Sequence, residues 1–146
     1  MRRMCPGVVK SRRQAMVLVD TSVWIRSFMG RSPFAQELDR LLSFDRVAGH
    51  ELVYGELLIG DRGGRKKHLS NYERMFRAPL VPHSEVVTFV EARHLHGRGV
   101  GWIDVHLLAS AVVGGHELWT ADPRLSAMAN EFGIDYQIPQ LGPRPL

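Results

Sequence analysis

Short aliphatic runs alternate with longer segments of helical periodicity along the chain. The run "VLV" at residues 17–19 predicts a buried strand, and the segment from Thr21 onward predicts the start of a helix. Further short strands are predicted at residues 46–50, 79–83, 117–121 and 133–137. Further helices are predicted at residues 34–42, 52–60, 85–95, 102–113 and 123–132, and another within residues 61–77, with glycine and proline between them. Gly60 is the predicted C-cap of the helix at residues 52–60, and Ser84 is the predicted N-cap of the helix at residues 85–95.

Strands that alternate with helices are typical of a parallel sheet covered by helices on both faces. The predicted fold class is therefore α/β, a three-layer α/β/α sandwich with a mainly parallel central sheet. In open sheets of this kind, ligands bind outside the carboxyl ends of the strands. Polar residues directly after a strand are thus the first candidates for a functional site.

The composition is that of an ordinary globular protein, with 45% hydrophobic and 23% charged residues. A chain of 146 residues is long enough for one domain with a core of its own. The single cysteine, Cys5, excludes an intramolecular disulfide and a cysteine-based zinc site, so we expect a cytoplasmic protein. No apolar run approaches the roughly 18 residues of a membrane span, so no membrane association is expected.

The net charge of +4 is unevenly distributed. Residues 1–15 contain five basic residues and no acid, which leaves about −1 for the rest of the chain. Such a composition, without an apolar segment, is typical of a flexible tail. We therefore expect a basic tail at residues 1–15, one globular domain at residues 16–138 and a proline-rich tail at residues 139–146.

Three aspartates stand at junctions between predicted elements. Asp20 follows the first strand directly, Asp122 follows a later strand, and Asp104 lies at the start of the strongly apolar helix. Each has a structural interpretation as a helix N-cap, because Asp accepts hydrogen bonds from the free N–H groups of a first helical turn. That interpretation is strongest for Asp122, since Pro123 occupies the favoured first helical position.

Glu56 cannot be a cap, because it lies inside a predicted, mostly apolar helix. Burying a carboxylate is costly unless it is paired, and no Lys or Arg lies three or four residues from Glu56. Glu51, the other acid of this segment, is better explained as a surface residue that complements the helix dipole. Glu56 is therefore a fourth candidate for chemistry.

Convergence of the four acids would require a cation. Two carboxylates about 5 Å apart repel by roughly 3 kcal/mol at an effective dielectric constant of 20. Hard oxygen ligands without cysteine favour Mg²⁺ or Mn²⁺, and an ion of this kind usually activates water for phosphodiester hydrolysis. The residues alone thus predict a metal-using acidic site on an α/β domain, suited to a nuclease.

Four segments occur in an order and spacing that resemble a known family: "VLVDTSVWI", "ELVYGELLIG", "GRGVGWIDVHLLASA" and "LWTADPRL". They are similar to a PIN domain, and specifically to a VapC-like toxin of a type II toxin–antitoxin system. Each segment alone is weakly specific, but the four in order are specific. The resemblance covers residues 16–137.

This resemblance implies catalytic, metal-ligating roles for Asp20, Glu56, Asp104 and Asp122. It also implies an endoribonuclease dependent on Mg²⁺ or Mn²⁺ that acts on structured RNA such as tRNA or rRNA and thereby inhibits translation. The implied partners are a VapB-like antitoxin, which neutralises the toxin, and a second copy of the chain in a homodimer.

Residues beside the acids have both a supporting and a structural interpretation. The hydroxyls of Thr21, Ser22 and Thr120 could orient a carboxylate or a water, or simply form turns and caps. Arg98 could meet a substrate phosphate or lie in solvent. The same alternatives apply to the basic cluster at residues 62–77, in which the candidate substrate-binding residues are Arg65, Lys66 and Lys67.

Aromatic residues near the acids are better explained by packing than by base stacking. Trp24, Trp102 and Trp119 all fall in predicted elements, so we expect them in the core. His106 projects from another side of its helix than Asp104, and a packing role is expected for it as well.

Other functions are compatible with parts of the pattern. A non-catalytic nucleic-acid-binding domain would keep the fold and use the acids as caps. A receiver-like phosphoacceptor domain would require a Lys after a late strand, where this chain has none. A metal-dependent phosphoesterase or DNA nuclease could use the same acidic site, because metal-assisted phosphoryl chemistry does not define the substrate.

Overall fold

The computed structural model describes residues 15–139. Three parallel strands form the sheet, in the order β2-β1-β3. They are β1 (Val17–Val19), β2 (Val47–Ala48) and β3 (Glu117–Trp119). The central strand β1 pairs with both neighbours, and the predicted parallel sheet is confirmed.

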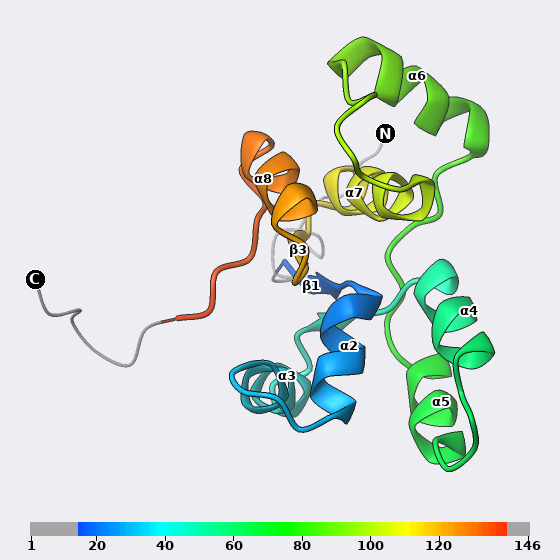
Figure 1. Cartoon of the computed structure of the whole chain (residues 1–146), viewed down its shortest axis with the longest axis vertical. Coiled ribbons are helices and arrows are strands. Elements are labelled where there is room, and N and C mark those ends of the chain that lie inside the picture. Colours follow the sequence, from blue (N-terminus) through cyan, green and yellow to red (C-terminus); the bar gives the residue numbers. More distant parts are fainter. Residues whose placement is uncertain (1–14, 140–146) are drawn as a thin grey trace, which may run out of the picture.

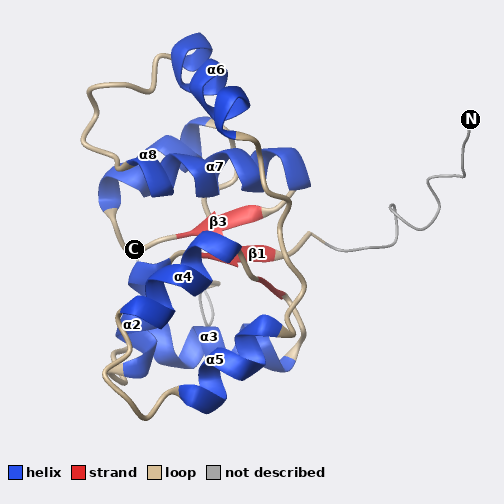
Figure 2. Cartoon of the chain, turned by 90° about the vertical axis from the view of Figure 1, so that its right-hand side faces the viewer, coloured by secondary structure: helices blue, strands red, loops and turns tan. Residues whose placement is uncertain are grey.

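The described residues form seven helices around the sheet. They are α2 (Thr21–Phe28), α3 (Phe34–Ser43), α4 (Glu51–Ile59), α5 (Lys66–Glu73), α6 (His83–Arg93), α7 (Trp102–Gly114) and α8 (Pro123–Glu131). Figure 2 shows α7 and α8 on one side of the sheet and α2, α3 and α5 on the other, which confirms the three-layer arrangement. Helix α6 lies outermost, next to α7 (Figure 1).

The core explains why β1 and α7 are so apolar. All three residues of β1 are fully buried between the two helical layers. Helix α7 buries a continuous run from Leu107 to Ala111. Complete burial of one Val or Leu side chain stabilises a fold by about 1.5–3 kcal/mol, so these two elements hold the layers together.

The predicted strand at residues 79–83 is wrong. Helix α6 begins at His83, and Ser84 lies inside its first turn instead of capping it; the N-cap is Pro82, without a side-chain cap bond. The neighbouring chain makes only one isolated bridge, between Arg77 and Gly49. Prolines at positions 79 and 82 cannot donate backbone hydrogen bonds to a sheet, which explains the difference.

The predicted last strand, residues 133–137, is confirmed in position but not in extent. It pairs with β3 at one isolated bridge, between Asp135 and Leu118. The Leu118 N–H donates to the Ile134 carbonyl, and the Tyr136 N–H donates to the Leu118 carbonyl. Both predicted tails lie outside the described residues, apart from Ala15 and Pro139.

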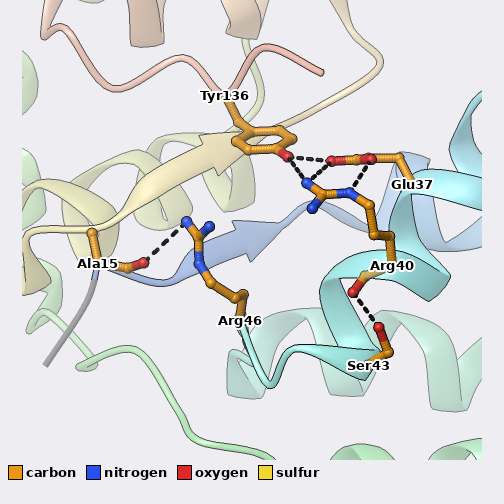
Figure 3. A network of polar contacts seen from close by, with 6 residues as sticks. All are labelled: Ala15, Glu37, Arg40, Ser43, Arg46 and Tyr136. Atoms are coloured by element: carbon orange, nitrogen blue, oxygen red, sulfur yellow. Dashed lines mark hydrogen bonds and ion pairs between the residues drawn. The ribbon is translucent and has the colours of Figure 1, made fainter. Parts of the chain in front are cut away.

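A network of hydrogen bonds connects the segment at residues 133–137 to α3 through Tyr136 (Figure 3). Arg40 donates two hydrogen bonds of 2.9 Å to the buried Glu37, and the Tyr136 hydroxyl also donates to that carboxylate. The hydrogen bond from Arg40 lowers the pKa of Glu37, while burial raises the pKa of Tyr136 to about 12. Glu37 therefore stays ionised and Tyr136 stays protonated, as the network requires.

Candidate active site

The ends of β1 and β3 bring two of the predicted acids to one edge of the sheet. Asp20 follows β1, and its backbone N–H donates to the Trp119 carbonyl at the end of β3. Asp122 lies three residues beyond Trp119, at the start of α8. Because β1 and β3 are parallel neighbours, their carboxyl ends meet at this edge.

The Asp20 carboxylate does not cap α2. Asp20 occupies the N-cap position, but its side chain makes no cap bond. Instead, its Oδ2 oxygen accepts hydrogen bonds of 2.8 Å from both Ser22 and Thr120. The capping interpretation is therefore wrong for Asp20. Its buried carboxylate is held by two hydroxyls, which both donate to the same carboxylate oxygen.

These hydroxyls also connect the two strand ends. The Ser22 Oγ accepts from the Ala121 N–H at 3.1 Å, and the Thr120 Oγ1 accepts from the Asp122 N–H at 3.0 Å. Each hydroxyl thus donates to Asp20 while it accepts from the loop after β3. This double role fixes the position of Asp20 relative to Asp122.

Glu56 lies half-buried on α4 and has a hydroxyl partner instead of a cation. Thr21 donates a hydrogen bond of 2.6 Å to its Oε1 oxygen. Among the described residues, no Lys or Arg nitrogen lies within ion-pair distance of Glu56, whereas the exposed Glu51 lies 3.8 Å from Arg77. All three predicted supporting residues, Thr21, Ser22 and Thr120, therefore contact a candidate acid.

Asp104 shows that the four carboxylates lie close enough to interact. It is half-buried in the first turn of α7, where Gly101 is the N-cap. The pKa of Asp104 is raised to about 6, first by burial and then by the negative charges of Asp20, Glu56 and Asp122, in that order. A hydrogen bond with the Gly101 backbone opposes the shift. The four acids therefore concentrate negative charge at this edge of the sheet.

Asp122 combines the capping role with a place in this cluster. Its Oδ1 oxygen accepts from the Arg124 N–H at 2.9 Å, and Pro123 occupies the first turn of α8, so the capping interpretation is confirmed. The Arg124 guanidinium lies 3.5 Å from the same oxygen. Arg124 is not among the residues predicted from the sequence, although its position two residues after a capping Asp is a usable signal for this contact.

The donor set fits a hard divalent cation. Every candidate ligand is a carboxylate oxygen, which Mg²⁺ and Mn²⁺ prefer, and the raised pKa of Asp104 marks the charge that a cation would neutralise. Within residues 15–139, no three Asp, Glu, His or Cys side chains already form a closed set of ligands. Mg²⁺ is often held by one or two carboxylates and keeps several waters, so a closed set is not required.

Comparison with known proteins identifies the family. Residues 17–131 match the family model of the PIN domain. The chain belongs to the PIN-domain family. It is 42% identical over 120 residues to ribonuclease VapC32 from two strains of Mycobacterium tuberculosis, CDC 1551 / Oshkosh and ATCC 25618 / H37Rv, which covers 82% of this chain and 94% of each relative. This PIN domain is therefore VapC-like.

A solved structure supports the fold alone. The crystal structure of PAE2754 from Pyrobaculum aerophilum matches this PIN domain with a TM-score of 0.50 and 20% sequence identity. The match covers 77% of this chain and 78% of that chain.

The predicted substrate-binding residues of this PIN domain lie outside the acidic cluster. Arg98 makes an ion pair with Glu131 of α8 and is not simply solvated. Arg65 places its guanidinium 4.5 Å from the centre of the Phe28 ring, and Lys66 and Lys67 are exposed on α5. Their role in binding stays a prediction.

The expectation for the tryptophans is confirmed for two of the three. Trp24 and Trp119 are buried in the core, but Trp102 is 42% exposed. Trp102 is the first residue of α7, and its ring contacts those of His83 and His106. Periodicity cannot reveal this exposure, because α7 is apolar along almost its whole length and its other exposed positions include Val112 and Val113, which are apolar as well.

Proposed function

We propose that this VapC-like PIN domain is the toxin of a type II toxin–antitoxin system and acts as a Mg²⁺-dependent, or Mn²⁺-dependent, endoribonuclease. The observation that carries the proposal is the convergence of four carboxylates at the sheet edge, where Asp20, Glu56 and Asp122 lie close enough for their charges to act on the half-buried Asp104. The 42% identity to a ribonuclease supports RNA as the substrate. Structured RNA such as tRNA or rRNA, cleaved in the cytoplasm to stop translation, is the proposed target.

The proposed catalytic residues are the four acids, which would hold the ion: Asp20, Glu56, Asp104 and Asp122. When bound, the ion supplies a water of lowered pKa and polarises the phosphate. The hydroxyls of Ser22 and Thr120 hold Asp20 through one oxygen, so its other oxygen is the one that accepts no hydrogen bond from the described residues. Thr21 holds Glu56 in the same way.

We further propose that basic residues outside the acidic cluster bind the phosphates of the RNA. Lys66 and Lys67 are exposed and have no acidic partner within ion-pair distance among the described residues. Arg65 stacks over the Phe28 ring, and Arg98 forms an ion pair with Glu131. These contacts order the two guanidinium groups near the surface. Contacts of this kind make RNA affinity fall with rising salt.

The proposed protein partners are a VapB-like antitoxin, which neutralises the toxin, and a second copy of the chain. Both follow from membership in the VapC-like group. None of the described helices has the length and apolarity needed to cross a membrane.

The test is cleavage of total cellular RNA with Mg²⁺, with Mn²⁺ and with EDTA. We expect cleavage that requires the metal and is lost in Asp20→Asn, Asp104→Asn and Glu56→Gln. Glu51→Gln is the matched control, because Glu51 lies on the same helix as Glu56 but is exposed and paired with Arg77. Cleavage in EDTA, or cleavage that survives these substitutions, would contradict the mechanism. Cleavage of DNA but not RNA would instead favour a DNA nuclease with the same acidic site.

A further inference from the structure

His50 is a fully buried residue that joins elements far apart in the sequence. It caps α4, where its Nδ1 accepts a hydrogen bond of 3.0 Å from the Leu52 N–H. Its Nε2 lies 2.9 Å from the Ser110 hydroxyl of α7. Because Nδ1 accepts, the ring proton is on Nε2, which donates to Ser110. Burial lowers the pKa of His50 to about 4, so the ring stays neutral, as this pattern requires.

The backbone at this position is anchored from the opposite side. The His50 N–H donates a hydrogen bond of 2.8 Å to the buried Tyr72 hydroxyl of α5. Glycine at position 49 permits this approach, since a Cβ there would lie 3.1 Å from the Tyr72 ring. His50 is therefore held rigidly at the exit of β2, and its ring has a defined direction toward α7.

The two helices that this contact joins carry two of the four candidate acids. Glu56 of α4 lies six residues after His50, and Asp104 of α7 lies six residues before Ser110. Near the contact, the starts of the two helices border an open apolar cavity of about 360 Å³, lined by Leu52 of α4 and by Trp102, Ile103 and His106 of α7. Apolar packing is incomplete here, so it does not by itself determine the spacing of α4 and α7.

We propose that the hydrogen bond between His50 and Ser110 is a positioning contact that sets the spacing of Glu56 and Asp104. The inference rests on the proposed function, because the consequence of this spacing is the affinity of the four acids for Mg²⁺ or Mn²⁺. His50 acts through α4 and Ser110 through α7. Neither residue touches the metal or the RNA.

The test separates the two hydrogen bonds of the His50 ring. His50→Asn keeps an acceptor near the position of Nδ1 but cannot reach Ser110, whereas His50→Gln places a donor near the position of Nε2. Ser110→Ala removes the acceptor alone. Tyr136→Phe is the matched control, because it removes a buried hydrogen bond to Glu37 of α3 that involves neither α4 nor α7. Circular dichroism and denaturant unfolding establish that each variant is folded.

Binding of Mn²⁺ by calorimetry is the main measurement. We expect His50→Asn and Ser110→Ala to weaken Mn²⁺ binding about tenfold, the effect typical of residues that orient metal ligands. His50→Gln and Tyr136→Phe should stay close to the wild type. In RNA cleavage, kcat of the two weakened variants should recover at excess Mn²⁺, while KM for RNA stays unchanged.

Three outcomes would overturn the inference, and the last is distinguishable from the first two. If the wild type binds Mn²⁺ and cleaves RNA, but folded Ser110→Ala and His50→Asn bind Mn²⁺ as the wild type does, the positioning role is wrong and the proposed function stands. The same holds if Tyr136→Phe weakens binding equally. If the wild type itself binds no Mn²⁺, the proposed function fails and this inference fails with it.

Discussion

Replacing Asp104 by Asn should stabilise the metal-free protein. The pKa of Asp104 is raised from 3.8 to about 6 by burial and by three neighbouring carboxylates. A shift of about two units corresponds to roughly 3 kcal/mol, which we reduce to about 2 kcal/mol because Asp104 is only half-buried and solvent screens part of the repulsion. Loss of the charge near the start of α7 costs about 0.5 kcal/mol of helix-dipole energy. The net gain at pH 7 is therefore about 1–2 kcal/mol.

The gain should depend on pH in a defined direction. A carboxyl whose pKa is raised in the folded state contributes stability that is present below pH 3.8 and lost as the pH rises through about 6. Asn stays neutral throughout, so the difference between Asp104→Asn and the wild type should be small near pH 4 and reach its maximum above pH 6. His50, whose pKa is lowered to about 4, loses its contribution as the pH falls through the same range. It is present in both proteins and cancels in the difference.

The assay is denaturant or thermal unfolding in EDTA between about pH 4 and pH 8. For a chain of this size, the gain corresponds to a rise in Tm of about 3–6 °C at pH 7. Glu51→Gln is the control, because it removes a first-turn acid of α4 without relieving the cluster, and it should lower stability slightly. A variant Asp104→Asn that is less stable than the wild type at pH 7, or a difference that does not change with pH, would refute the reasoning.

Three further outcomes are expected. Thr120→Val removes a buried hydroxyl that donates to Asp20, so it should lower the free energy of unfolding by about 1–3 kcal/mol and also weaken Mn²⁺ binding in calorimetry. Tyr136→Phe should cost a similar free energy in denaturant unfolding while leaving the rate of RNA cleavage unchanged, because its partner is the buried carboxylate of α3. Lys66→Ala and Lys67→Ala should each reduce the slope of log affinity against log salt by about 1 in RNA-binding titrations, and an unchanged slope would exclude phosphate contacts.

The sequence by itself determined the main features of the fold and the candidate acids. Three consecutive aliphatic residues at positions 17–19 must be buried in a small α/β domain. They therefore predicted a buried strand, which the structure confirms as the central strand of the sheet. Asp20 follows that strand directly, and parallel strands present their carboxyl ends at one edge. Glu56 stood out because a carboxylate without a nearby cation is costly inside an apolar helix. These inferences depend only on local patterns and general sheet geometry.

Only the tertiary structure decided what each polar group contacts. Local patterns offered the same capping interpretation for Asp20 and Asp122, yet Asp122 caps its helix and Asp20 accepts hydrogen bonds from Ser22 and Thr120. Thr120 lies 100 residues from Asp20 in the sequence, and no local periodicity predicts such a pair. The exposure of Trp102 likewise depends on which elements pack around α7.

The same limit applies to the contact between His50 and Ser110, which lie 60 residues apart. A histidine before a helix and a serine within another helix are unremarkable in sequence. They become partners because the exit of β2 and the middle of α7 meet in the folded chain. The sequence thus determines which groups are available for chemistry, and the packing of strands and helices determines which of them act together.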